Sequence, residues 1–427
     1  MGKLLKQKYK VFLKVAICIL LYRVSLDYIY LKVISPIWDY QHFYTDINNT
    51  FWVLSYVWVL LIILFDYQLF IDRRPSSVFL LLLDQLFFLP MTSVIPLAGM
   101  TSEFFIYCFL YWVLIVLLQK RILLKPYDQS GIIDLQKKKN TIYFLVAAFI
   151  IGLNFIITIH YFGFHIKIDL KDVYDIRFAV RDLNLPTSVK YLKPIAAKLT
   201  LVTILILLIK KKYIWLIPLV LVQLENFAFG ALKSDFFALL LVFIVGVFYK
   251  TKHLQYVFFA LIGANLLVII EYLLYDVSFI SIVIHRRILY MPSIISYDYY
   301  SFFSENEFVY FRDSFMRHFG FKSPYDLEVP RLIGREMDGN EEVNCNTGII
   351  GDDYAQLGWL GLLVFPYLRY LLLRLYDKVM LPCSEKLIVY VSFIYVLVFV
   401  SGTLFSSLIT GGFLIICFMI YLLTKEK

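Results

Sequence analysis

The sequence has little charge and few cysteines. Only 17% of its 427 residues are charged, whereas about 25% are charged in a typical soluble domain. The five cysteines form no Cys-x-x-Cys pair, and only Cys345 falls in a predicted outer loop. This composition does not fit a soluble domain, and no disulfide framework is expected.

The common metal and nucleotide motifs are also missing. The chain has no His-Glu-x-x-His pair, no phosphate-binding P-loop and no glycine run after a strand. No paired aspartates mark a soluble domain for nucleotide sugars. We therefore expect no metal and no cofactor, and we expect a substrate that arrives already activated.

What the chain has instead is long hydrophobic blocks, since 61% of its residues are hydrophobic. A block of about 20 apolar residues can cross a membrane as a helix. The sequence predicts an all-α polytopic integral membrane protein with about twelve spans. They are residues 11–32, 50–71, 78–97, 103–119, 141–163, 194–209, 214–231, 235–250, 254–276, 348–372, 385–408 and 410–424.

The first span contains Arg23 and Asp27, four residues apart. No small-residue cleavage site follows the first apolar run, so we interpret it as a retained helix and not a secretory signal. The spacing predicts that Arg23 and Asp27 form a buried ion pair on one helix face.

The net charge of +9 comes mainly from short connections such as Lys210–Lys212. The short loops on the opposite side, 33–49 and 98–102, contain no Lys or Arg. This asymmetry predicts a bacterial cytoplasmic (inner) membrane protein with both termini in the cytoplasm. It also argues against nucleic acid as a partner.

Two longer segments, 164–193 and 277–347, carry positive charge on the predicted outer side. Long loops can cross regardless of charge, so the prediction remains a single membrane domain, 1–427, with two outer loops. The larger loop contains mainly arginine, whose planar fork binds phosphate or carboxylate. Its arginines are Arg286, Arg287, Arg312, Arg317, Arg331 and Arg335.

Two groups of cations are candidates for binding an anion. Arg177 and Arg181 share a face if their segment is helical, and they would form an anion clamp or a solvated helix with internal ion pairs. Lys233 lies at a hairpin between two hydrophobic runs. An ionisable group at membrane depth is a functional candidate, but Lys233 could equally lie above the interface and contact water.

A third group follows in the larger loop. His285, Arg286 and Arg287 precede an aromatic series that includes Tyr297 and Tyr300. Adjacent arginines repel one another unless an anion or acids gather them, and aromatic faces suit sugar rings. The alternative is an amphipathic re-entrant helix with interfacial aromatics. His285 could be a base, but a hydrogen-bonded surface histidine is the commoner case.

The fourth group is the segment Asn344–Gly361. Its glycines allow close backbone approach. Asp352 and Asp353 lie near the outer end of the predicted span. Either carboxylate could be a general base, or both could favour the helix dipole at a helix N-terminus.

Four segments together resemble the bacterial oligosaccharide repeat-unit polymerases of the O-antigen polymerase type. They are VYDIR at 173–177, GALKSDFFALLLVFIVGVFYK at 230–250, RRILYMPSIISYDYYSFF at 286–303 and NTGIIGDDYAQLGWLG at 346–361. The resemblance covers roughly residues 170–375. The first 160 residues are similar only as hydrophobic spans.

The resemblance implies metal-independent glycosyl transfer on the outer leaflet, within a GT-C-like membrane plan whose large outer loop contains short helices. Both partners would be polyprenyl-diphosphate-linked glycans, and the lipid diphosphate would be the leaving group. A chain-length regulator and a flippase would be further partners. The family has no single catalytic signature that maps onto this chain.

The implied roles are distributed over the candidate residues. Arg177, Arg181, Lys233, Arg286 and Arg287 would bind the diphosphate. Asp353, Asp352 or His285 would take the acceptor proton, and the sugar contacts would be Tyr297, Tyr300, Phe303 and Tyr354. Two alternatives remain open, an O-antigen ligase that transfers glycan to a lipid core and a flippase for lipid-linked oligosaccharides.

Overall fold

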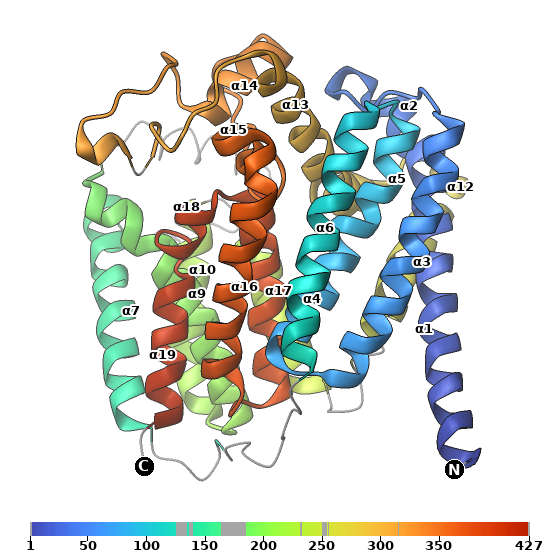
Figure 1. Cartoon of the computed structure of the whole chain (residues 1–427). Helices are drawn as coiled ribbons and strands as arrows, with labels where there is room; N and C mark the ends of the chain where they lie inside the picture. Colours follow the sequence, from blue (N-terminus) through green and yellow to red (C-terminus); the bar gives the residue numbers. More distant parts are fainter. Residues whose placement is uncertain are drawn as a thin grey trace. The chain divides into compact units, whose positions relative to one another are not determined.

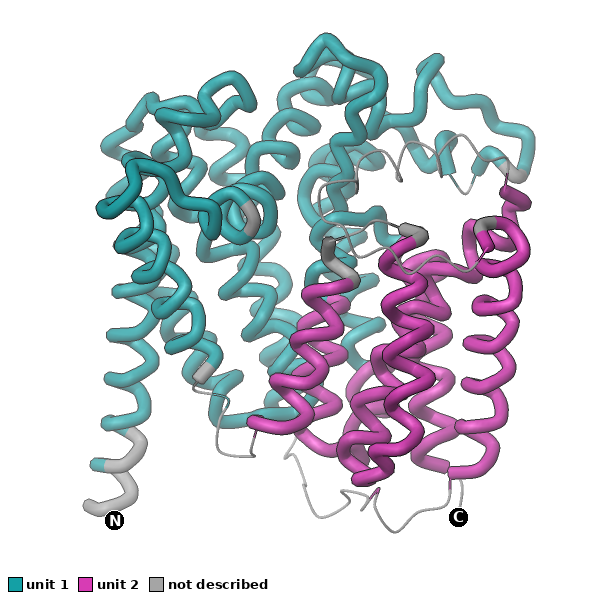
Figure 2. Tube along the Cα trace, turned by 180° about the vertical axis from the view of Figure 1, so that it is seen from behind, with its two compact units in different colours: residues 1–127, 252–374, 396–404 teal, residues 128–251, 375–395, 405–427 magenta. Residues whose placement is uncertain are grey.

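The computed structural model describes residues 2–124, 135, 140–163, 185–230, 233–249, 254, 256–314 and 316–425. Over these residues the chain forms helices and no strand (Figure 1). They form two compact units, each built from separate stretches of the chain (Figure 2). Unit 1 contains residues 1–127, 252–374 and 396–404, and unit 2 contains 128–251, 375–395 and 405–427.

Eight helical segments of the described chain are long and apolar enough to cross a membrane. They are Asn49–Asp72, Pro75–Leu97, Ser102–Leu123, Thr141–Tyr161, Thr187–Ile209, Val257–Tyr275, Gly351–Met380 and Leu404–Lys425. Two apolar helices, Tyr213–Ala228 and Phe236–Phe248, are shorter. A polytopic helical membrane protein is thus confirmed. Each of the twelve predicted ranges overlaps a helix, while twelve spans remains a prediction.

The first half of unit 1 runs from the N-terminus to residue 123. Its elements are α1 (Gly2–Ile29), η1 (Tyr30–Ile34), α2 (Ser35–Trp38), η2 (Asp39–Gln41), α3 (Asn49–Asp72), α4 (Pro75–Leu83), η3 (Asp84–Phe88), α5 (Leu89–Leu97) and α6 (Ser102–Leu123). Asn48 caps α3, because its side chain accepts a hydrogen bond from the Phe51 amide at 3.1 Å. Pro75 lies in the first turn of α4, where proline is tolerated because no intrahelical N–H bond is lost.

The second half of unit 1 begins with α12 (Tyr256–Tyr275). It continues with η6 (Ser281–Tyr290), α13 (Met291–Glu305), η7 (Met316–Phe319), α14 (Val329–Asp338), α15 (Gly351–Leu357), η8 (Gly358–Leu360) and α16 (Gly361–Met380). The outer loop predicted for 277–347 therefore contains helices. The π-helical η6 leads directly into α13, and both contact α5.

The first stretch of unit 2 contains α7 (Thr141–Phe162), α9 (Thr187–Ile209), η4 (Tyr213–Trp215), α10 (Leu216–Gly230), α11 (Lys233–Phe243) and η5 (Ile244–Phe248). Its later stretches contain the end of α16, most of α17 (Glu385–Ser401), most of α18 (Leu404–Leu408) and α19 (Phe413–Lys425). Within it, α7 contacts α9, α10 and α19. At one end of the unit, the Asn140 side chain donates a hydrogen bond of 2.6 Å to the Leu423 carbonyl.

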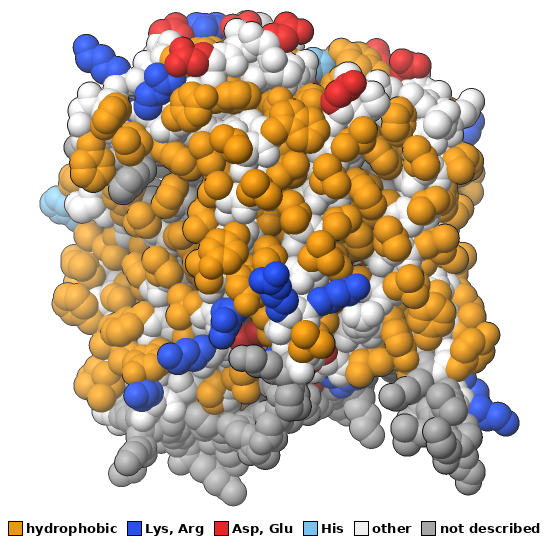
Figure 3. Space-filling view, viewed as in Figure 1, with side chains coloured by type: hydrophobic (Ala, Val, Ile, Leu, Met, Phe, Trp, Pro, Cys, Tyr) orange, Lys and Arg blue, Asp and Glu red, His pale blue; other side chains and the backbone are white. Residues whose placement is uncertain are grey.

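The exposed surfaces of the helices are largely apolar, as expected for helices that lie in lipid. On α3, Val53, Val57, Leu60 and Leu64 form a stripe along one face, and each has an exposed fraction of 50% or more. The segment Pro75–Leu97 is instead buried on every side. Over the helices, Figure 3 shows mainly hydrophobic side chains, and the charged ones gather toward the helix ends. Such extended apolar surface is stable only against lipid or a partner.

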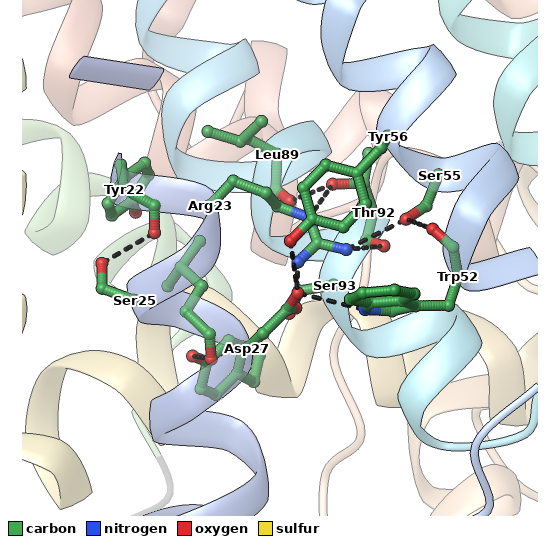
Figure 4. A network of polar contacts seen from close by, with 12 residues as sticks. Tyr22, Arg23, Ser25, Asp27, Trp52, Ser55, Tyr56, Leu89, Thr92 and Ser93 are labelled. Carbon is green, nitrogen blue, oxygen red and sulfur yellow. Dashed lines mark hydrogen bonds and ion pairs between the residues drawn. The ribbon is translucent and has the colours of Figure 1, made fainter. Parts of the chain in front are cut away.

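A buried polar network joins α1, α3 and α5 (Figure 4). Arg23 and Asp27 form an ion pair, which confirms the prediction. The Arg23 guanidinium also donates to the Ser55 hydroxyl at 3.0 Å and to the Thr92 carbonyl at 2.9 Å. The Tyr56 hydroxyl donates to Asp27 at 2.9 Å. These bonds compensate the cost of burying a charged pair.

Candidate functional site

The candidate site lies at one end of unit 1, where α2, the following loop and the η6–α13 segment meet. Figure 1 shows α2 and α13 at the end of unit 1 away from the N-terminus. Five side chains form a group that we call the Arg286 cluster. They are Trp38, Gln41, His42, Arg286 and Asp298.

Arg286 is held in place by two neighbours. Its Nη1 donates to the Gln41 Oε1 at 2.5 Å, and its guanidinium carbon lies 4.0 Å from the centre of the Trp38 ring. A cation over an indole face is attracted by the ring quadrupole. The next residue, Arg287, is exposed and forms no ion pair with a residue in the described part of the chain. Two neighbouring cations therefore lie on η6, and the guanidinium of Arg286 is preorganised.

His42 and Asp298 form the second pair of the cluster. The His42 Nδ1 lies 3.1 Å from the Asp298 Oδ1, and the two side chains are 18% and 7% exposed. The hydrogen bond to Asp298 raises the pKa of His42, although burial opposes it, so the cationic imidazolium is favoured. Burial raises the pKa of Asp298, and the bond to His42 partly reverses that effect. The pair thus combines a cation near the surface with a carboxylate below it.

The backbone at this loop is unusual. His42 has a φ of 64°, in the left-handed region, and its amide donates to the Asp39 carbonyl at 3.0 Å. Non-glycine residues in that region are uncommon, and histidine is among the more frequent exceptions. The turn directs the imidazole toward α13.

Exposed aromatic rings surround these cations. Tyr40 and Tyr44 are 68% and 48% exposed. The Tyr40 ring lies 5.6 Å from Trp38, and the Tyr44 ring is stacked on His42. The indole Nε1 of Trp38 is buried and has no acceptor among the described residues. Guanidinium groups and exposed aromatic faces together suit an anion that is attached to a sugar or to another ring.

The predicted carboxylates lie elsewhere in unit 1 and are buried. Asp353 is 0% exposed. It accepts hydrogen bonds from Arg369 Nη1 at 2.6 Å, Arg369 Nη2 at 3.1 Å and the Tyr111 hydroxyl at 2.5 Å. Asp352 is 5% exposed and accepts from Gln356 at 3.1 Å. A base must reach the proton that it abstracts, so Asp353 in this conformation is a structural ion-pair partner.

The glycines around these aspartates do allow close approach, as predicted. A Cβ added to Gly348 would lie 2.1 Å from the Phe399 carbonyl oxygen and 2.2 Å from that of Gly402. A Cβ on Gly361 would lie 2.7 Å from the Asp353 carbonyl oxygen. The segment therefore packs backbone against backbone.

His285 is not a surface histidine, so that interpretation is wrong. Its side chain is 0% exposed, and its Nε2 lies 2.6 Å from the Asn265 Oδ1. Burial lowers the pKa of His285 to about 4, because the charged form loses its hydration. A neutral, enclosed imidazole joins η6 to α12 and does not contact an external substrate in this conformation.

Three of the four predicted sugar contacts are packing residues. Phe303, Tyr354 and Tyr300 are 0%, 3% and 7% exposed. The Tyr300 and Tyr354 rings lie 4.5 Å apart and join α13 to α15. A ring that is enclosed by protein offers no face to a sugar, so the structure does not support this role for the three. Tyr297 is only partly buried and lies 5.2 Å from the Phe104 ring.

Three further cations were predicted as diphosphate ligands, Arg177, Arg181 and Lys233. Arg177 and Arg181 lie outside the described residues. Lys233 begins α11 in unit 2, and its side chain is likewise outside the description. Of the five predicted diphosphate ligands, Arg286 and Arg287 are the two whose side chains are described.

Two charge pairs were not found from the sequence. Arg369 lies inside the predicted span 348–372, and a charge within an apolar span was the available signal. His42 and Asp298 are separated by 256 residues along the chain. No local pattern connects positions so far apart, so only the fold could pair them.

Comparisons of the chain with protein-family models, with characterised proteins and with solved structures gave no match in any of the three.

Proposed function

We propose that this chain polymerises polyprenyl-diphosphate-linked oligosaccharide repeat units into a surface polysaccharide. The observation that carries the proposal is the Arg286 cluster, where preorganised cations lie beside exposed aromatic rings at one end of a helical membrane unit. A lipid-linked glycan presents the same two chemistries, a diphosphate and sugar rings, at a membrane surface. The sequence resemblance to repeat-unit polymerases supports the same function.

Each side chain of the cluster has a part in the proposed reaction. The acceptor hydroxyl oxygen attacks the anomeric carbon of the donor, and the bond from that carbon to the lipid diphosphate oxygen breaks. Arg286 and Arg287 bind the diphosphate and stabilise the charge that develops on it. The hydroxyl proton passes to the imidazole of His42 in its neutral form, and Asp298 stabilises the imidazolium that results. No metal takes part.

Tyr40 and Tyr44 replace the buried aromatics as sugar contacts in this proposal. Their exposed rings flank His42 and Trp38, so a sugar stacked there would place its anomeric phosphate near Arg286. This assignment is specific to the first outer loop, 33–49, which the sequence interpretation treated only as a short connection.

The proposed topology has twelve spans, with both termini in the cytoplasm of a bacterial cell. Eight of these spans are the long apolar segments given above. The other four are α1, α10, α11 with η5, and α17. The excess of lysine at the connections supports this orientation. Reporter fusions at Lys425 and after Tyr44 test it, and cytoplasmic signal at both sites would contradict it.

The activity is tested with purified protein in liposomes and a labelled lipid-linked repeat unit. Formation of glycosidic bonds between repeat units supports the proposal. Transfer only to a lipid-core acceptor would instead indicate a ligase, and exchange between leaflets without bond formation would indicate a flippase. Either of those results would overturn it.

Variants connect that activity to the cluster. Arg286→Ala and Arg287→Ala together should reduce polymer formation by about 100-fold or more, because charge-assisted hydrogen bonds contribute roughly 1.5–3 kcal/mol each. Arg317→Ala is the matched control, since Arg317 is an exposed arginine of the same predicted outer loop. Full polymer length in the double variant would refute the role of the cluster.

A further inference from the structure

Unit 2 contains a cavity of about 800 Å³ that the proposed reaction does not use. It lies between α7, α9 and α10, and apolar side chains such as Phe144, Ile151, Leu207 and Leu219 line most of it. Its volume falls within the range of roughly 300–1,000 Å³ that is typical of small-molecule sites. An apolar cavity of this size between membrane helices needs an occupant that is itself apolar.

The cavity extends over about half of the membrane thickness. Thr141, at the first turn of α7, and Gly152 both line it. Along an α-helix these residues are about 16 Å apart, whereas the hydrocarbon core of a bilayer is roughly 30 Å thick. The cavity therefore corresponds in depth to one leaflet.

One end of the cavity is cationic. Lys210 and Lys212 line it where α9 ends, and Trp215 lines it where α10 begins. Lys210 donates a hydrogen bond to the Leu135 carbonyl, and Lys212 is exposed. The residues that line the cavity in the described part of the chain include no Asp or Glu. Lysines beside an exposed tryptophan are typical of the level of lipid headgroups.

These features together define the occupant. We propose that unit 2 binds one anionic phospholipid, whose phosphate contacts Lys212 and Lys210 and whose acyl chain fills the cavity between α7, α9 and α10. The lysine end is the side predicted to face the cytoplasm, so this lipid would belong to the inner leaflet. It is therefore distinct from the proposed substrate, whose diphosphate would lie at the outer leaflet.

The structure offers a direct way to block the cavity. Gly152 lines the cavity, and a Cβ added there would meet nothing within 4 Å, so the backbone accepts a side chain at this position. Gly263 on α12, in unit 1, also has open space within 4 Å and does not line this cavity. Gly152→Leu and Gly263→Leu therefore form a matched pair.

The test counts lipids bound to the purified full-length protein by native mass spectrometry after delipidation and addition of defined lipids. We expect one tightly bound phosphatidylglycerol in the wild type and in Gly263→Leu, and about tenfold weaker binding in Gly152→Leu. Lys210→Gln with Lys212→Gln should remove the preference for phosphatidylglycerol over phosphatidylethanolamine. A melting curve for each variant verifies folding, and the lysine variants keep the test valid if Gly152→Leu does not fold.

Three results would overturn this inference. They are equal binding of the two phospholipids by the wild type, unchanged binding in both sets of variants, and displacement of phosphatidylglycerol by equimolar undecaprenyl phosphate. The last would show a polyprenyl occupant. Because the readout is bound lipid and not polymer, the result is independent of whether the proposed polymerase activity is found.

Discussion

Arg369 on α16 donates two hydrogen bonds to Asp353 on α15, at 2.6 and 3.1 Å, from sixteen residues further along the chain. Both side chains are buried, at 7% and 0% exposure. Tyr111 on α6 adds a third bond, to the same carboxylate. The pair therefore fixes the glycine-rich segment against α16 and α6 within unit 1.

Replacing one member of this pair should destabilise the protein more than replacing both. Arg369→Met alone leaves Asp353 as a buried, uncompensated charge, and such a loss costs about 3–5 kcal/mol. The double variant Arg369→Met with Asp353→Leu removes both charges and should recover most of that stability. Thermal unfolding in detergent measures the difference.

The same pair of variants separates a structural role from a catalytic one. If Asp353 only positions α15, the double variant should also recover polymer formation. A double variant that is as stable as the wild type but inactive would show instead that Asp353 is the base.

Trp38 should contribute to the proposed anion site through Arg286. Trp38→Leu removes the ring beneath the guanidinium, and a cation–π contact is worth roughly 0.5–2 kcal/mol. We expect the Michaelis constant for the lipid-linked donor to rise by several-fold. Trp359→Leu, at an exposed tryptophan of η8, is the control, because no cation is stacked on that ring in the described structure. An equal effect of the two changes would contradict the contact's role.

The sequence predicted a polytopic helical membrane protein, because a span of apolar residues is a local property. It also predicted Arg23 with Asp27, whose spacing of four residues places them on one helix face. The burial of Phe303 and Tyr354 was not predictable in the same way. Phe303 lies in a predicted outer loop and Tyr354 at the outer end of a predicted span, so both look available to a ligand from sequence. Only the packing of α13 on α15 shows that they are enclosed. His42 and Asp298 belong to the same class, because their contact depends on two distant segments.

The His42–Asp298 pair predicts a pH dependence of stability. The bond to Asp298 raises the pKa of His42 above its usual value, which is about 6.5 in an unfolded chain. The protonated pair therefore stabilises the fold fully below that pH, and the contribution is lost as the pH rises through the folded value. Because His42 is partly exposed, we expect less than about 1 kcal/mol.

Melting temperatures at pH 6 and pH 8.5 measure this effect. The wild type should lose more stability between the two values than His42→Gln, which has no titrating imidazole at this position. Asp298→Asn should weaken the dependence as well, since it removes the partner that raises the pKa. A dependence that is identical in all three proteins would exclude the pair as its source.

Gly348 should be intolerant of any side chain. Its amide donates to the Val400 carbonyl at 3.0 Å, so the backbone of this segment lies directly against the end of α17 within unit 1. The Cβ of an alanine would approach two carbonyl oxygens to 2.1 and 2.2 Å, and neither oxygen can rotate away as a side chain could. The segment would have to separate, which breaks backbone hydrogen bonds and shifts Asp353 relative to Arg369. We therefore expect Gly348→Ala to cost about 3 kcal/mol or more, because it overpacks the contact and breaks buried hydrogen bonds.

Gly263→Ala is the matched control, because its Cβ meets open space and alanine favours a helix over glycine by about 1 kcal/mol. Unfolding curves of the two variants should thus shift in opposite directions, and equal stability would mean that the close contact at Gly348 does not exist.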